Sequence, residues 1–82
     1  MYLEIITPDQ KYFEGEVDSA TFPGSDGSFQ VLKNHAPIIS SLGKGELSYK
    51  SNNDEFSVNV EGGVVEVMNN KVIVLVESIL KD

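Results

Sequence analysis

Apolar and polar residues alternate one by one through much of this sequence, and this two-residue period is the feature that most limits how the chain can fold. In the segment EFSVNV, Phe56, Val58 and Val60 alternate with Ser57 and Asn59. Successive side chains of a strand point to opposite faces, so this pattern is typical of a strand buried on one face. VVEVM alternates similarly, whereas KVIVLV is apolar on both faces, as expected of a strand in the middle of a packed layer.

Turn-forming residues divide these segments repeatedly along the chain, a pattern typical of a small all-β sandwich or barrel. They lie at Pro8-Asp9, Pro23 to Gly27, Gly43 to Gly45, Asn52 to Asp54 and Asn69-Asn70. The other strand candidates are YLEIIT, KYFE, VDSATF, GSFQVL, IISSL and ELSYK. Gly62-Gly63 predicts a bulge or a corner between two sheets. Only the tail VESILKD has residues that could begin a helix.

The length of 82 residues allows one domain, which we place at residues 1–82. The chain contains no cysteine, which excludes disulfides and thiolate metal ligands. MYLEIITPDQ lacks the features of a signal peptide, and the longest strongly apolar run, VIVLV, is far shorter than the roughly 20 residues that cross a bilayer. We therefore expect a soluble domain without direct membrane insertion.

The formal net charge is −7, and the six basic residues are scattered along the chain. An acidic surface repels phosphate backbones and anionic lipids, so we expect no nucleic-acid partner and no direct docking on an anionic membrane. Acidity by itself indicates only solubility.

His35 is the only histidine and therefore the first residue to consider for chemistry. A metal site needs several converging ligands, and the carboxylates are dispersed without the spacing of a calcium loop. A hydrolase needs a nucleophile beside a base, and no Gly-x-Ser-x-Gly motif is present. We therefore predict no catalytic residue, metal or cofactor, and a structural or interface role for His35.

The segment from Gly24 to Leu42, GSDGSFQVLKNHAPIISSL, has the composition of a stiff exposed surface. Gly24 and Gly27 enclose a tight loop that requires positive φ. Pro37 lacks an amide hydrogen and favours an extended conformation at the preceding residue. The result is an extended edge beside one imidazole, and a stiff surface loses little entropy on binding. A rigid crossover between two sheets is the alternative explanation.

In their order along the chain these segments resemble a known family. GSDGSFQVLKNHAPIISSLGKGEL, followed by VEGGVVEVMNNKVIVLVES, resembles the N-terminal domain of the epsilon subunit of F-type ATP synthases, the homologue of the mitochondrial delta subunit. The opening LEIITPDQKYFEGEVDSATFPG fits the first strands of the same family, so the resemblance covers essentially the whole chain.

The resemblance implies a flattened two-sheet β-sandwich of about ten short strands and a non-catalytic place in the rotor, or central stalk, of the synthase. Such a subunit binds the gamma subunit and the membrane-embedded ring of c subunits, and couples proton translocation to ATP synthesis or hydrolysis. It works as a peripheral part of the whole complex at the cytoplasmic face of the bacterial plasma membrane.

The resemblance also assigns residues to each contact. Those expected at the gamma interface are Thr7, His35, Ala36, Pro37 and Ile38. Those expected to face the c-ring are Ser25, Asp26, Gly27 and Ser28. Phe29 and Val31 are expected beneath this surface as core or support.

Two departures limit what the resemblance implies. Many members continue into a C-terminal pair of helices that inhibits hydrolysis or binds ATP, and this sequence stops at Asp82, about where those helices begin. Inhibition and nucleotide sensing are therefore not expected. Ser28 stands where the ring-facing loop often has an acidic residue, and Asp26 is a possible substitute.

Two alternatives come from other classes of protein. A biotinyl or lipoyl carrier domain is also a β-sandwich of this length, and EVMNNKV offers Lys71 beside a turn, although no methionine flanks this lysine directly. An unrelated adaptor or small-ligand β-barrel is the other alternative.

Overall fold

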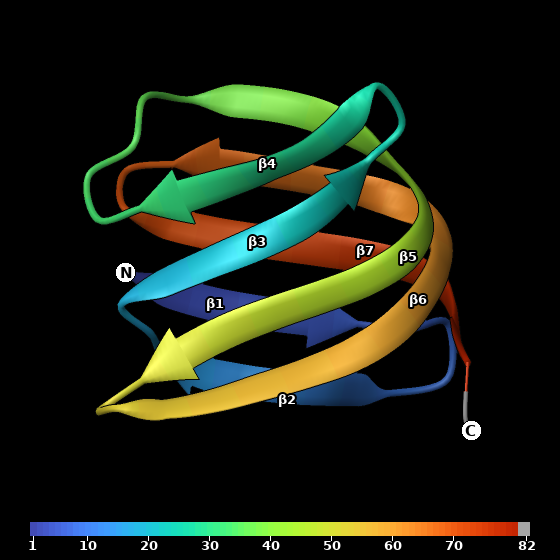
Figure 1. Ribbon diagram of the computed structural model, residues 1–82, viewed down its shortest axis with the longest axis horizontal. Helices are drawn as coiled ribbons and strands as arrows, with labels where there is room; N and C mark the ends of the chain where they lie inside the picture. The colour runs from blue at the N-terminus through green and yellow to red at the C-terminus, as the bar shows by residue number, and fades with distance from the viewer. Residues whose placement is uncertain (81–82) are drawn as a thin grey trace.

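The computed structural model describes residues 1–80. In these residues the regular secondary structure consists of β-strands alone (Figure 1). The seven strands are β1 (Tyr2–Ile6), β2 (Lys11–Glu16), β3 (Ser19–Gly24), β4 (Gly27–Leu32), β5 (Ile38–Ser51), β6 (Asp54–Met68) and β7 (Lys71–Leu80). Their hydrogen-bonded order is β2-β1-β7-β6-β5-β3-β4; β1 and β7 run parallel, and the other neighbours run antiparallel. The predicted all-β fold is confirmed.

This sheet folds over on itself to make the two layers of a sandwich. Figure 1 shows β3 and β4 in front of β1 and β7, while β5 and β6 curve from one layer into the other. β5 has 14 residues and β6 has 15, so each supplies a segment to both layers without interruption. The structure therefore has seven strands where about ten short ones were expected, because the long strands bend instead of breaking.

Gly62 and Gly63 lie at the bend of β6, as predicted. Their φ angles are 71° and 137°, in the positive region that glycine adopts without steric cost and most other residues rarely adopt. In the β5–β6 ladder, Leu42 pairs with Gly63 and Lys44 pairs with Glu61, and the pair between them is missing. This gap places both glycines at the turn between the layers. A β-carbon on Gly63 would lie 2.2 Å from the carbonyl oxygen of Leu75, so the β7 backbone approaches here more closely than any side chain permits.

The core between the two layers is entirely apolar among the described residues, with no polar or charged side chain buried. Its largest fully buried side chain is Phe22, which packs against Phe29 with ring centroids 5.5 Å apart. Val31 is also fully buried, and Phe29 packs against the core while half-buried. The predicted supporting role of Phe29 and Val31 is therefore confirmed.

The suggestion that VESILKD begins a helix is wrong for its described part. Glu77 to Leu80 continues β7, and Ile79 and Leu80 pair with Val60 and Asn59 of β6. The remaining two residues of the segment, 81 and 82, lie outside the described residues. Ladder hydrogen bonds and the contact of Ile79 with the core favour the strand over a short isolated helix.

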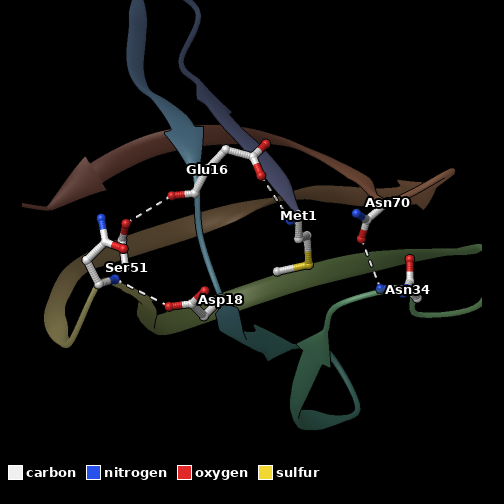
Figure 2. Close-up of polar contacts among 7 residues, drawn as sticks. Met1, Glu16, Asp18, Asn34, Ser51 and Asn70 are labelled. Carbon is white, nitrogen blue, oxygen red and sulfur yellow. Dashed lines mark hydrogen bonds and ion pairs between the residues drawn. The ribbon is translucent and has the colours of Figure 1, made fainter.

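Loops at the two ends of the long strands are fastened to neighbouring turns (Figure 2). Ser51 donates its hydroxyl hydrogen to the carbonyl of Glu16, at 3.0 Å, and the Asn52 amide donates to the carboxylate of Asp18, at 3.3 Å. These bonds join the β5–β6 hairpin to the β2–β3 connection. At the other connection, the Asn34 amide donates to the side-chain oxygen of Asn70, at 2.9 Å.

Candidate protein-binding surface

One outward side of the sandwich carries a group of apolar side chains that residues 1–80 leave partly or fully exposed. In the layer formed by β1, β7, the end of β6 and the start of β5, inward positions such as Ile5, Val74 and Val65 are fully buried. The alternate positions point away from the core. We call their apolar members the apolar face: Ile6, Ile39, Val64, Met68, Ile73 and Leu75.

The strand register makes one row of the apolar face continuous. Ile6 of β1 lies opposite Leu75 of β7, and Leu75 lies opposite Val64 of β6, so three apolar side chains follow one another across three strands. Ile39 is 73% exposed and Met68 is 51% exposed. Scattered exposed apolar residues are ordinary, but a contiguous group of this kind is typical of a surface that a partner covers.

Thr7 lies at one corner of the apolar face, at the end of β1. Its hydroxyl donates to the carbonyl of Gln10 at 2.9 Å and accepts from the Gln10 amide at 3.1 Å. This reciprocal pair of bonds closes the turn before β2. Thr7 and Pro8 also line an open groove of about 600 Å³ beside Leu75.

His35 lies in the connection between β4 and β5, which the structure fixes by local hydrogen bonds. Its amide donates to the carbonyl of Leu32 at 3.1 Å, and its Nδ1 lies 2.6 Å from the carbonyl oxygen of Ala36. The preceding Asn34 has φ of 64°, and its amide is held by Asn70. Among the described residues the imidazole makes no hydrogen bond to a hydroxyl or carboxylate, so it lacks the neighbours of a catalytic base.

The structure does not bring the five residues expected at the gamma interface into one compact cluster. His35, Ala36, Pro37 and Ile38 are consecutive; Ala36 and Pro37 are exposed, and Ile38 packs against the core. Thr7 follows Ile6, and Ile6 lies in a cross-strand row with Leu75, Val64 and Ser41. Ile38 lies in a different row, with Val67 and Val72. Thr7 and His35 therefore lie at opposite ends of the layer, and the apolar face lies between them.

The four residues expected to face the c-ring form the tip of the β3–β4 hairpin. Ser25, Asp26, Gly27 and Ser28 are all exposed, and Gly27 has φ of 128°. Gly24 is also required, because a β-carbon there would lie 2.6 Å from the carbonyl oxygen of Gly27. Ser25 is tied to the start of β5: its amide donates to the Ser41 carbonyl at 3.0 Å, and the Ser41 hydroxyl donates to its hydroxyl at 2.9 Å.

Charged residues form a network on the outer side of β1 and β2. Lys11 pairs with Glu4 at 3.2 Å and with Glu14 at 3.1 Å, and Lys71 pairs with Glu4 at 3.4 Å. The Tyr2 hydroxyl donates to Glu14. This bond raises the pKa of Tyr2 to about 12, and it lowers the pKa of Glu14 below its ordinary value with help from the hydrogen bond from Lys11.

Lys71 does not have the position of a carrier lysine. It is the first residue of β7, and the tip of the hairpin consists of Asn69 and Asn70, with φ of 52° and 61°. Its amino group is held by Glu4 and lies 5.8 Å from the centre of the Tyr2 ring.

In residues 1–80 no three histidine or carboxylate side chains converge as metal ligands. The same residues contain no helix that is long and apolar enough to span a membrane.

The apolar face is the part of the surface that sequence reasoning missed. KVIVLV begins β7, which lies between β1 and β6 in the middle of the layer as predicted, but Leu75 is 47% exposed and Ile73 is only half-buried. An apolar run on both faces indicates that both faces are covered, without distinguishing a second layer from a partner. The apolar run therefore predicted the central strand correctly but did not indicate that its outward side is partly exposed in residues 1–80.

Comparison with known proteins identifies the family. The domain model described as "ATP synthase, Delta/Epsilon chain, beta-sandwich domain" matches residues 1–82. The ATP synthase epsilon chain of Maridesulfovibrio salexigens is 46% identical over 77 residues, which are 94% of this chain and 54% of that protein. The epsilon chain of Chlorobium limicola is 44% identical over 78 residues, which are 94% of this chain and 89% of that protein.

Two solved structures share the fold. A chain in the Euglena gracilis mitochondrial ATP synthase structure (OSCP/F1/c-ring, rotational state 1) superposes with a TM-score of 0.89 at 20% identity, over 95% of this chain and 51% of that one. A chain in the central stalk/c-ring structure of the Tetrahymena thermophila mitochondrial ATP synthase gives 0.82 at 19% identity, over 98% and 65%. The family match over residues 1–82 and the close relatives together show that this chain belongs to the ATP synthase delta/epsilon chain family, as its β-sandwich domain.

Proposed function

We propose that this chain is a non-catalytic subunit of the ATP synthase rotor that binds the gamma subunit through the apolar face and its two corners. The observation that carries the proposal is the outward-facing apolar row of Ile6, Leu75 and Val64, in which Leu75 is exposed and the other two are half-buried, with the exposed Ile39 and Met68 beside it. Removing such side chains from water contributes roughly 25 cal/mol per Å² of apolar area, enough to drive association of two folded surfaces. Thr7 and His35 mark the ends of the contact.

The face is suited to a stiff contact. It lies on a layer whose inward side chains are fully buried, and Asn70 holds the loop that contains His35. Ala36 and Pro37 present small, exposed groups with restricted backbone freedom. Because these groups lose little conformational entropy on binding, most of the favourable contact free energy remains as affinity.

The tip of the β3–β4 hairpin is the proposed contact with the c-ring. Ser25 to Ser28 are exposed, and Ser41 fastens the tip to β5, so the loop projects without being loose. Asp26 carries the only charge of these four residues and is suited to polar loops of a partner. This contact supplements the apolar face instead of replacing it.

With both contacts made, the sandwich would connect gamma to the ring and prevent one from slipping against the other. Proton translocation at the ring would then be coupled to ATP synthesis or hydrolysis elsewhere in the complex, without chemistry on this chain. The subunit would be peripheral to the membrane, and we place it at the cytoplasmic face of a bacterial plasma membrane. Together the two contacts need to bury more than roughly 1,000 Å², the lower range for a specific interface.

Replacing His35 with alanine tests the gamma contact. We expect gamma to bind about five- to tenfold more weakly because a half-buried ring at the edge of the interface is lost. The melting temperature should change little, since within residues 1–80 the imidazole forms a hydrogen bond only with the neighbouring carbonyl. Titration calorimetry with purified gamma gives the affinity, and calorimetric unfolding of the isolated domain gives the stability.

Lys50→Ala serves as the control, because this exposed side chain lies in the half of β5 that belongs to the other layer. The affinity of the Lys50→Ala variant for gamma should equal that of the unaltered chain. A fall in melting temperature with unchanged gamma binding for His35→Ala would instead assign His35 a structural role. Absence of gamma binding by the well-folded, unaltered chain would contradict the proposed function itself.

A further inference from the structure

Two carboxylates, Glu4 and Glu66, lie among the apolar side chains of this face, and both are directly opposite Ile73. Glu66 lies directly opposite Ile39 on β5 and directly opposite Ile73 on β7, so both of its cross-strand neighbours are isoleucines. Met68 follows on the same side of β6, and together with Ile73 it lines an open groove beside Glu66. The Glu66 carboxylate is exposed.

Glu66 makes no ion pair within residues 1–80, unlike Glu4 and Glu14. Lys71 borders the same groove, but its amino group is held by Glu4 at 3.4 Å and lies against the ring of Tyr2. No described residue therefore forms an ion pair with Glu66.

A partner that covers Ile39, Met68 and Ile73 necessarily covers Glu66 as well. Burial of an unpaired carboxylate costs several kcal/mol in general, enough to offset much of the gain from the apolar side chains around it. The cost is avoided when the partner supplies a cation at that position, and the same arrangement rejects partners that lack one.

We propose that Glu66 selects the partner by pairing with a lysine or arginine side chain that projects from an apolar segment of the gamma subunit. The inference rests on the proposed function and adds to it the chemistry of the docking segment: apolar side chains against Ile39, Met68 and Ile73, with one cation among them. Charge complementarity at this point fixes how the segment is oriented on the face.

Glu66→Gln is the test, because glutamine keeps the shape of the side chain and removes its charge. We expect the affinity for purified gamma to fall at least about tenfold, since the partner's cation is left buried without a counter-ion. Between about 50 and 200 mM salt, the affinity of the unaltered chain should fall more steeply than that of the variant. Glu55→Gln is the matched control: it removes the same charge from the other half of β6, where Glu55 is exposed and lies opposite Lys50 of β5.

The outcomes separate the two proposals. A loss confined to Glu66→Gln, with Glu55→Gln unchanged, supports the pairing. Equal or tighter binding by Glu66→Gln overturns it while leaving gamma as the partner, and equal losses in both variants also overturn it, because they indicate only general attraction to an acidic surface. If the unaltered, folded chain does not bind gamma at all, the proposed function fails first. Calorimetric unfolding of both variants should show melting temperatures near that of the unaltered chain, because both side chains are exposed.

Discussion

Replacing Gly63 with alanine is expected to unfold most of the domain at room temperature. The added β-carbon would lie 2.2 Å from the Leu75 carbonyl oxygen and 2.9 Å from the Val76 Cα, and both are backbone atoms that cannot move without breaking the β6–β7 pairing. The φ of 137° adds strain for any residue other than glycine. We expect a loss of about 3–5 kcal/mol, comparable with the whole stability of a domain of this size. Urea unfolding followed by circular dichroism measures it.

Gly43→Ala is the control at the same bend. A β-carbon there would meet its nearest atoms at 3.9 Å, which is ordinary contact, and its φ is not in the left-handed region. We expect a change within about 0.5 kcal/mol. Similar urea midpoints for the two variants would contradict the account of the bend as a backbone contact that only glycine permits.

The double substitution Ile39→Thr with Leu75→Thr is expected to abolish measurable gamma binding while the domain stays folded. Each side chain contributes roughly 1.5–3 kcal/mol when an apolar surface covers it, so losing both should weaken binding by about 100-fold or more. Threonine retains the strand preference of a β-branched residue. Titration calorimetry with gamma measures the loss.

The matched control replaces Tyr12 and Phe56 with threonine. These side chains are 44% and 46% exposed, so the apolar area removed is of the same kind, but they lie outside the apolar face. Gamma binding should be unchanged in this control. Equal weakening in both double variants would indicate that exposed apolar area in general, and not this face, determines the affinity.

Local chemistry was enough to predict much of the fold. The alternation at Val58 and Val60, the asparagine turns and the bend at Gly62-Gly63 all depend on residues close together in the chain, and each was predicted correctly. The number of strands depends on whether β5 and β6 break at the bend or continue through it. Continuation preserves hydrogen bonds to neighbours distant in sequence, so the period of the sequence could not reveal it.

The candidate surface was harder to predict because it is assembled from several strands. His35 and its neighbours are consecutive and could be selected from the sequence, whereas Ile6, Leu75 and Val64 become adjacent only through the parallel β1–β7 pair and the β6–β7 register. The parallel pairing joins two strands from opposite ends of the chain. Nothing in either segment alone specifies that partner.

The central claim, that gamma covers the apolar face, is tested most directly by cysteine labelling. The chain has no cysteine, so Ile39→Cys introduces a single reactive thiol on the face, and Glu55→Cys introduces one on the other layer. We predict that saturating gamma slows maleimide labelling at position 39 by about tenfold or more and leaves position 55 unchanged, because labelling of the thiol requires access from solvent. Unchanged labelling at position 39 in a complex that demonstrably contains gamma would contradict the account.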